Sequence, residues 1–266
     1  MGFTDGRKTT GLYTAEVAGT ERITPHMVRV TFRGNDLARL PRRGYDQWCR
    51  LFLPRSEGDT DFTAVPEGFG IGGYLKYATA KSGTRPPFRN YTIRAHRPEA
   101  GEIDIDFVAH GGTGIAGPWA QRAQPGERIA LIDQGRGFDP IEATGAVLLV
   151  GDESALPAIA GILRDLPDDA AGLAIVEIPD PADRQELAAP AGVELRWLPR
   201  ADPHDRPGLL ALDAVRAWTP EDPATLHAYL AGEQQLVAES RRHLVAVGVP
   251  KHRISFTGYW RVGRAG

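Results

Sequence analysis

The sequence predicts two units of different fold class, an antiparallel β-barrel over residues 1–142 followed by an α/β unit with a parallel sheet over residues 143–266. In the first half, apolar and polar residues alternate, as in Val28–Arg33, so that one face of a strand would be buried and the other solvated. The second half opens with a continuous apolar run, Ala146–Gly151, which is typical of a strand covered on both faces. This change of pattern places the boundary between the units at about residues 140–146.

Short strands punctuated by glycine and proline follow one another along the first half, and together they favour a small antiparallel barrel. The clearest alternation is that of Ile103, Ile105 and Phe107 with the two aspartates between them. Residues 55–87 form a polar, glycine-rich insertion, for which we expect a long loop with room for one helical turn. The expected strands are residues 28–33, 48–53, 89–96, 102–109 and 128–132.

The second half alternates buried strands with helices, which predicts a parallel sheet with βαβ crossovers. After the first strand, apolar residues recur at helical spacing over residues 154–166, as Leu156, Ile159 and Ile162 show. The other expected strands are residues 173–178, 193–197, 227–231 and 253–257, and the other expected helices are residues 209–218 and 234–247.

Composition and charge exclude several classes of protein. A net charge of −3 gives no basic surface for nucleic acid, and the apolar runs are too short to insert into a membrane. Cys49 is the only cysteine, which excludes an internal disulfide, a cysteine-rich zinc site and an iron–sulfur cluster held by this chain. The amino-terminal residues lack an apolar signal core, so we expect a cytoplasmic protein, and the polar surface is compatible with a monomer.

The segment Arg89-Asn90-Tyr91-Thr92 combines a cation, an aromatic ring and a hydroxyl within one expected strand. Because side chains alternate along a strand, Arg89 and Tyr91 share one face and Thr92 lies on the other. Arginine binds phosphate through a planar fork and tyrosine offers a flat face, so the pattern suits a ligand with a diphosphate and a heterocycle. On these residues alone, an ordinary barrel strand with one exposed arginine remains an open alternative.

The pattern G-x-G-x-x-G occurs twice. Gly68–Gly73 follows no expected strand, and we interpret it as a flexible loop. Gly112–Gly117 follows a strand and precedes a short helix with Pro118 in its first turn, where free amides favour phosphate. Since the preceding strand alternates, we favour a phosphate cradle at the edge of the barrel over a dinucleotide fingerprint, with a plain structural turn as the alternative.

The expected nucleotide edge of the α/β unit carries carboxylates where a fingerprint would carry glycines. Gly151-Asp152-Glu153-Ser154 follows the first strand of this unit, and its acidic residues could cap the next helix. The same charges would repel a pyrophosphate, so a nicotinamide nucleotide is expected to bind weakly or in an unusual pose. Ala231-Gly232-Glu233-Gln234 ends another strand at the same edge.

The carboxyl-terminal segment Phe256–Arg261 brings Tyr259 and Trp260 together with a cation after the last strand. Two interpretations stand equal on these residues: a strand with a docked aromatic end, or an aromatic lid against a flat cofactor.

Taken together, these segments resemble the siderophore-interacting protein family, FAD-dependent ferric-siderophore reductases built on a ferredoxin-reductase-like plan. The resemblance covers nearly the whole chain, and its boxes occur in the family's order. They are Val30-Thr31-Phe32, Arg89-Asn90-Tyr91-Thr92, Asp106-Phe107-Val108-Ala109-His110-Gly111, Gly117-Pro118-Trp119-Ala120, Gly151-Asp152-Glu153-Ser154-Ala155-Leu156-Pro157 and Gly258-Tyr259-Trp260-Arg261.

The resemblance implies FAD between an FAD-binding barrel and an α/β NAD(P)H-binding-like unit. Arg89 would pair with the diphosphate, Tyr91 would stack on the isoalloxazine and Thr92 would hydrogen-bond near its reactive edge. Ser154 stands where the family usually has threonine. The remaining implied cofactor-binding residues are Asp106, Val108, His110, Gly114, Ala116, Trp119, Asp152, Tyr259 and Trp260, and the basic candidates for binding an anionic ferric siderophore are Arg50, Lys76, Lys81, Arg261 and Arg264.

The function that follows is a ferric-siderophore reductase, with NAD(P)H or reduced ferredoxin as electron donor. Electron transfer to Fe(III) needs no acid or base, so no catalytic residue is assigned. A general flavin or ferredoxin-type electron-transfer reductase, and a flavin-containing siderophore-binding protein without turnover, are the alternatives.

Overall fold

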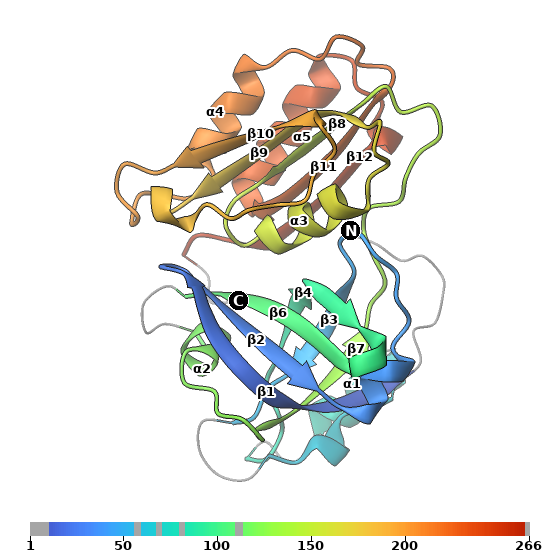
Figure 1. Ribbon diagram of the computed structural model, residues 1–266, viewed down its shortest axis with the longest axis vertical. Coiled ribbons are helices and arrows are strands. Elements are labelled where there is room, and N and C mark those ends of the chain that lie inside the picture. Colours follow the sequence, from blue (N-terminus) through green and yellow to red (C-terminus); the bar gives the residue numbers. More distant parts are fainter. Residues whose placement is uncertain (1–10, 56–59, 68–70, 80–82, 110–113, 264–266) are drawn as a thin grey trace.

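The chain folds into two stacked units, a barrel below and an α/β unit above in Figure 1, joined by the segment between β7 and β8. The structure is a computed structural model that describes residues 11–55, 60–67, 71–79, 83–109 and 114–263. The barrel strands are β1 (Leu12–Thr24), β2 (Met27–Arg33), β3 (Trp48–Phe52), β4 (Phe88–Thr92), β5 (Ala95–Arg97), β6 (Glu102–Val108) and β7 (Arg128–Asp133). The predicted fold class, an antiparallel barrel followed by a parallel-sheet α/β unit, is confirmed.

The barrel sheet has the order β4-β3-β7-β1-β2-β6-β5, and all of its pairings are antiparallel. The single strand predicted over residues 89–96 is wrong, because β4 and β5 lie at opposite ends of this sheet. Only Ile93 and Arg94 separate them. The Ile93 amide donates to Gln47 and the Arg94 amide to Asp104, so the bend between β4 and β5 brings the two edges of the sheet together.

The first strand, β1, was not predicted, because its burial is irregular. Of its thirteen residues only Ala15, Val17 and Thr24 are buried, and register shifts interrupt its pairing with β2. By contrast, Phe32 and Ile103 face each other across β2 and β6 with no exposure, as their alternation indicated.

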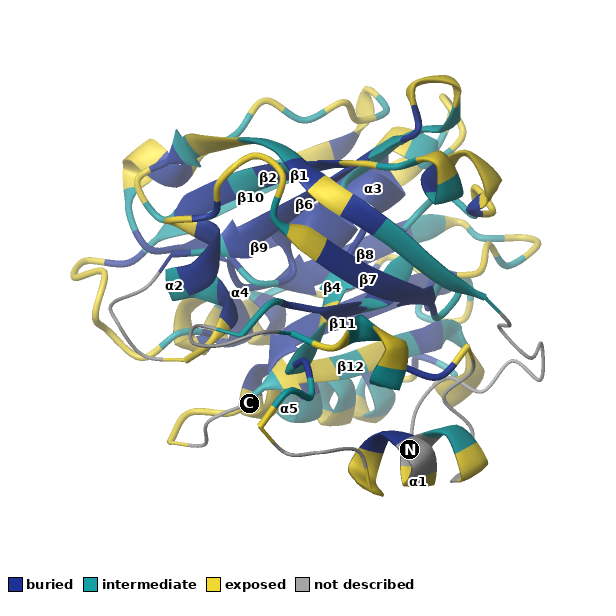
Figure 2. Ribbon diagram, turned by 90° about the horizontal axis from the view of Figure 1, so that it is seen from below, coloured by how far each residue is buried: buried dark blue, intermediate teal, exposed yellow. Residues whose placement is uncertain are grey.

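The insertion before β4 contains more helix than expected. Helix α1 (Ile71–Thr79) has nine residues, about two and a half turns, and starts inside the glycine motif that we interpreted as a loop. Tyr77 of this helix packs edge-on against Phe52 on the outer face of the barrel. The short helix α2 (Ala116–Ala120) covers one end of the barrel, and Figure 2 shows that α1 keeps exposed residues at the periphery.

The α/β unit has the parallel order β10-β9-β8-β11-β12. Helix α3 lies between this sheet and the barrel, whereas α4 and α5 cover the opposite face (Figure 1). The predicted elements are all present, with bounds β8 (Ala146–Gly151), α3 (Leu156–Asp165), β9 (Ala171–Ile178), β10 (Gly192–Pro199), α4 (Leu209–Ala217), β11 (Leu226–Glu233), α5 (Gln234–Ala246) and β12 (Ile254–Trp260).

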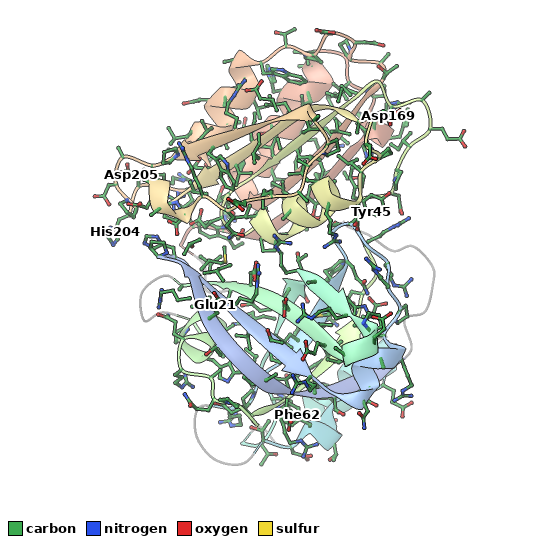
Figure 3. The ribbon with its side chains drawn as sticks, viewed as in Figure 1. Glu21, Tyr45, Phe62, Asp169, His204 and Asp205 are labelled. Atoms are coloured by element: carbon green, nitrogen blue, oxygen red, sulfur yellow. The ribbon has the colours of Figure 1, made fainter. Side chains whose placement is uncertain are left out.

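Tyr45 forms one contact between the units and lies at their junction in Figure 3. Its amide donates to Asp165 at the end of α3 at 2.5 Å, and its ring packs on Phe138. The helix approaches so closely here that a Cβ on Gly161 would lie 2.1 Å from the Tyr45 carbonyl oxygen.

The β1–β2 hairpin forms a second contact between the units. The Asp183 carboxylate, from a short 3₁₀ turn after β9, accepts from the Thr24 hydroxyl at 2.7 Å and from the His26 amide at 2.9 Å. Met27 packs into the apolar cluster beneath α3. These contacts hold the β1–β2 hairpin against the α/β unit.

Candidate functional site

The Arg89–Thr92 segment lies on β4, at the place where the barrel sheet closes. Tyr91 pairs with Cys49 and Arg89 with Leu51, so both side chains share the inner face of β3 and β4, as the alternation indicated. Thr92 is buried on the other side of the strand.

The ring of Tyr91 packs at 4.4 Å from that of Phe107 and joins the barrel core while remaining partly exposed. Burial of its hydroxyl raises the Tyr91 pKa, an effect that the nearby Arg89 cation partly offsets. Tyr91 is therefore a neutral, rigidly supported aromatic ring.

Arg89 has no carboxylate partner among the residues that the structure describes. Its one hydrogen bond is from the guanidinium to the carbonyl of Phe88 at 2.8 Å. The residues of this site thus include a half-buried cation beside an aromatic ring, which is the combination that a diphosphate linked to a heterocycle requires.

The carboxyl-terminal aromatics lie against the same junction. Tyr259 is the extra residue of a bulge in β12, where the register with β11 shifts between Gly232 and Glu233. Its hydroxyl lies 2.9 Å from that of Tyr229 in β11. The ring itself is 39% exposed. A contact between two hydroxyls therefore joins β11 to the bulge of β12.

Asp152 is fully buried in the turn after β8, and its oxygens already have partners within the chain. They accept from the amide and hydroxyl of Ser154, from the Glu233 amide at 2.6 Å and from the Trp260 indole at 3.1 Å. Burial, followed by the neighbouring Glu153 charge, raises the Asp152 pKa to about 7. The Asp152 carboxylate thus ties the ends of β8, β11 and β12 together, and its place beside the cofactor stays a prediction.

Glu153 points into the interior rather than toward an incoming nucleotide. The two terminal nitrogens of the Arg200 guanidinium, Nη1 and Nη2, donate to Glu153 at 3.0 and 2.9 Å. Nη1 also donates to Glu177 at 3.2 Å. Glu177 in turn accepts the amides of Gly208 and Ala211 at the start of α4. The expected repulsion of pyrophosphate by Glu153 is therefore compensated by a buried cation. Neither acidic residue caps α3, whose preceding residue, Ala155, provides no side-chain cap.

Two of the expected cofactor residues belong to the barrel interior. Asp106 forms a paired contact with Arg29 at 2.7 and 2.8 Å, and Trp119 is 2% exposed, with its indole donating to Glu127. Their side-chain polar atoms are satisfied inside the barrel, and their assignment to the cofactor site stays a prediction. Trp119 anchors α2 by packing on Phe107.

The glycine loop leads into α2 beside the end of β6. Gly114 is exposed and has a φ of +92°, whereas Ala116 is buried. A Cβ on Gly117 would lie 2.9 Å from the carbonyl oxygen of Val108, so only glycine lets α2 approach β6 this closely. Val108 itself is half-buried against the apolar cluster beneath α3.

The basic candidates are not gathered on one face. Arg50 pairs with Asn90 on the outer face of the barrel, with its guanidinium over the Phe88 ring, so it does not share the Tyr91 side. Arg261 is exposed beyond β12. His110, Lys81, Arg264 and the side chain of Lys76 lie outside the described residues.

Sequence reasoning missed Asp46, Tyr229 and Arg200. Asp46 is 3% exposed in the loop before β3 and accepts the amides of Gly137 and Phe138. Tyr229 read as one more apolar residue of a buried strand, although its hydroxyl needs a partner there. This need for a hydrogen-bond partner is the feature of the sequence that could have drawn attention to Tyr229.

The described residues fit FAD in two respects: an unpaired guanidinium beside a partly exposed ring on β4, and a second exposed ring on β12. Within the described part of the chain, no helix is long and apolar enough to cross a membrane. The same residues contain no group of histidine, cysteine and carboxylate side chains able to hold a metal ion.

Comparison with known proteins agrees with this geometry. Residues 16–137 match the siderophore-interacting FAD-binding domain, and residues 144–263 match the siderophore-interacting protein family. The ferric vibriobactin reductase ViuB of Vibrio cholerae is 31% identical, over 91% of this chain and 86% of its own length.

Solved structures show the same architecture. A siderophore utilization protein from T. fusca superposes with a TM-score of 0.78 at 31% identity, covering 97% of this chain and 95% of its own. The ferredoxin reductase of carbazole 1,9a-dioxygenase superposes with a TM-score of 0.65 at 18% identity, covering 94% and 70%, and so shows the fold alone. With a ferredoxin-reductase-like fold and both family domains in order, this chain belongs to the siderophore-interacting protein family.

Proposed function

We propose that this protein is an FAD-dependent ferric-siderophore reductase that releases iron as Fe(II). The observation that carries the proposal is the Arg89 guanidinium beside Tyr91 on β4, which has no carboxylate partner among the described residues. A cation and an aromatic face thus lie together on one face of β4, and the Thr92 hydroxyl follows on the other face.

In this proposal Arg89 holds the diphosphate, Tyr91 supports the ring system and Thr92 donates or accepts a hydrogen bond at its edge. Gly114 and the backbone around Ala116 and Val108 would border the adenosine half, and His110 stays a candidate from the sequence. Tyr259 and Trp260 shield the site from the α/β side. When bound, FAD would carry electrons from the donor to the ferric chelate.

Iron release follows from coordination chemistry. Ferrous iron is the softer and less charged ion, so a hard oxygen chelator that grips Fe(III) holds Fe(II) far more weakly. The protein has to bring the chelate close to the flavin, and basic side chains would raise the local concentration of an anionic chelate. Arg261 is the candidate with a described, exposed position, and Arg50, Lys76, Lys81 and Arg264 stay candidates from the sequence.

The donor is NAD(P)H or reduced ferredoxin. The edge of the sheet where a nicotinamide nucleotide would bind is filled by the Asp152 and Glu153 contacts. This crowding favours a weakly bound nucleotide or a protein donor. We propose that the protein works as a monomer.

The test is an anaerobic absorbance titration of the purified protein. Flavin bands should bleach with NADPH, NADH or reduced ferredoxin, and they should return on adding a ferric catecholate or a ferric hydroxamate. Bleaching without recovery on any ferric chelate would indicate a general electron-transfer reductase, and stable bands with a bound chelate would indicate a siderophore-binding protein. A colourless protein that cannot be reconstituted with FAD contradicts all three.

Tyr91→Ala tests the cofactor site, because it removes the aromatic ring that packs on Phe107. It should retain less flavin and shift the absorbance bands. Tyr13→Phe, a change in a ring that also packs against the barrel core, should retain flavin fully.

A further inference from the structure

Three aromatic rings pack in a row from β4 through the barrel core to α2. The Tyr91 ring lies 4.4 Å from that of Phe107 in β6, with an angle of 46° between the ring planes. Phe107 in turn meets Trp119 of α2 edge-on, at 5.7 Å and 66°. Among the described residues, Phe107 is the one ring that contacts both of the others. The row therefore connects β4 to α2 through a single side chain.

The α2 end of this row is held firmly. Trp119 is 2% exposed, and its indole donates to Glu127 at 2.9 Å. The Phe32 ring stacks on the indole, with an angle of 4° between their planes and 6.2 Å between their centroids. Because the indole is held by a hydrogen bond and by a second ring, it offers Phe107 a fixed surface. The position of Phe107 thus depends on the position of α2.

Phe107 leaves the Tyr91 ring little freedom to tilt. The second side-chain torsion of tyrosine has a broad, roughly twofold preference, so the neighbours of the ring decide its tilt. Phe107 is fully buried, and the 4.4 Å between the two centroids is at the short end of the usual range of about 4.5–7 Å for aromatic pairs. Tyr91 is only partly buried. A ligand that stacks on Tyr91 therefore meets a ring whose tilt Phe107 sets.

We infer that Phe107 is a positioning residue that connects the two halves of the FAD site. The inference rests on the proposed function, in which Tyr91 supports the flavin ring and the loop before α2 borders the adenosine half. Because Phe107 packs on Tyr91 and on Trp119, a displacement of α2 changes the tilt of the Tyr91 ring. Binding of the adenosine half at this loop therefore orients the surface on which the flavin ring stacks. Phe107 acts through Tyr91 and does not itself touch the reacting atoms.

The first test is Phe107→Leu, which removes the shared ring and keeps an apolar side chain in the core. Bound FAD should show altered circular dichroism in its visible bands, because this signal depends on how the flavin ring is held. Its Kd should rise roughly two- to tenfold, as for the loss of one aromatic pair. If Phe107→Leu fails to fold, Phe107→Met takes its place, because methionine fills irregular gaps without a ring.

Phe52→Leu is the matched control. Phe52 is also fully buried, but its ring packs on Tyr77 and Phe88 in a different apolar cluster. This variant should lower the melting temperature, as Phe107→Leu does, and should leave the Kd and the circular dichroism of FAD unchanged. The comparison separates positioning of the flavin from loss of a buried ring.

A second test uses riboflavin, which lacks the diphosphate and the adenosine and so probes the flavin-ring half alone. Trp119→Phe changes the α2 end of the row, at a residue whose ring contacts within the described part of the chain are with Phe32 and Phe107. It should nevertheless weaken riboflavin binding and alter the circular dichroism of the bound riboflavin. In a Phe107→Leu background the same change should do neither, because the connection between the two residues has been removed.

The outcomes separate this inference from the proposed function. Equal Kd and equal circular dichroism of FAD in Phe107→Leu and Phe52→Leu would overturn the positioning role alone, as would a Trp119→Phe effect on riboflavin that persists undiminished in Phe107→Leu. An altered FAD signal in Phe107→Leu supports the positioning role even if ferric chelates fail to reoxidise the wild-type flavin, a failure that would overturn the reductase proposal. A wild-type protein that binds no flavin overturns both.

Discussion

The indole N–H of Trp260 donates to the carboxylate of Asp152 at 3.1 Å, which ties the end of the last strand to the turn after β8. The same carboxylate accepts the Glu233 amide, so Asp152 joins the carboxyl ends of three neighbouring strands. A Cβ on Gly232 would lie 2.7 Å from it, and the φ of +117° at this residue also favours glycine. The edge of the sheet is thereby fixed by one buried acid.

This acid should give the protein a pH-dependent stability. The Asp152 pKa of about 7 in the folded protein lies above the ordinary value of 3.8, so the folded state keeps a proton that the unfolded chain loses first. The stabilisation is therefore complete below the lower value and is lost as the pH rises through about 7. In Asp152→Asn, the free energy of unfolding should depend less on pH. Urea unfolding measured at several pH values between 3.8 and about 7 checks this. Asp169→Asn, at an exposed position, is the control, and parallel curves for wild type and Asp152→Asn would contradict the assignment.

Arg89→Ala should weaken FAD binding, because it removes the unpaired cation beside Tyr91. A charge-assisted hydrogen bond contributes roughly 1.5–3 kcal/mol, so Kd should rise about tenfold or more. Isothermal titration of the flavin-free protein measures this. Arg128→Ala changes an exposed arginine at the start of β7 and should leave Kd unchanged. An equal affinity in both variants would remove Arg89 from the site.

Gly161→Ala should destabilise the protein even though alanine is the better helix former. In an open helix the change would stabilise by about 0.5–1 kcal/mol. Here the added Cβ would lie 2.1 Å from the Tyr45 carbonyl oxygen, so α3 must move away from the barrel, at a cost of roughly 1–3 kcal/mol. Thermal unfolding measures the sign. Gly19→Ala, where nothing lies within 4 Å, is the comparison, and a Gly161→Ala variant as stable as wild type would show that the units do not dock as described.

Arg200→Ala should be the most damaging of these changes, because it leaves Glu153 and Glu177 buried without their cation. Breaking a buried ion pair by removing one partner costs about 3–5 kcal/mol. Arg196→Ala breaks an exposed pair with Glu194 and should cost no more than about 1 kcal/mol. Chemical denaturation of the two variants compares them directly, and equal losses would mean that the buried network contributes little.

The sequence by itself determined the elements whose burial is regular along the chain. Val30 and Phe32 alternate with polar residues because one face of β2 is buried, and Ala146–Gly151 is apolar throughout because helices cover both faces of the parallel sheet. It also placed Arg89 and Tyr91 on one face of a strand, since side-chain alternation is a local property.

Only the tertiary structure decided what the polar residues do. Whether residues 89–96 form one strand or two depended on the closure of the barrel, which Gln47 and Asp104 enforce from elsewhere in the chain. The side chains of Asp106, Trp119 and Asp152 are hydrogen-bonded to Arg29, Glu127 and Trp260, partners that the sequence did not indicate. Tyr229 and Tyr259, whose hydroxyls are hydrogen-bonded to each other, lie 30 residues apart in the sequence. A hydrogen bond depends on the position of both partners in space, and spacing along a chain contains no information about that position until the two units have packed together.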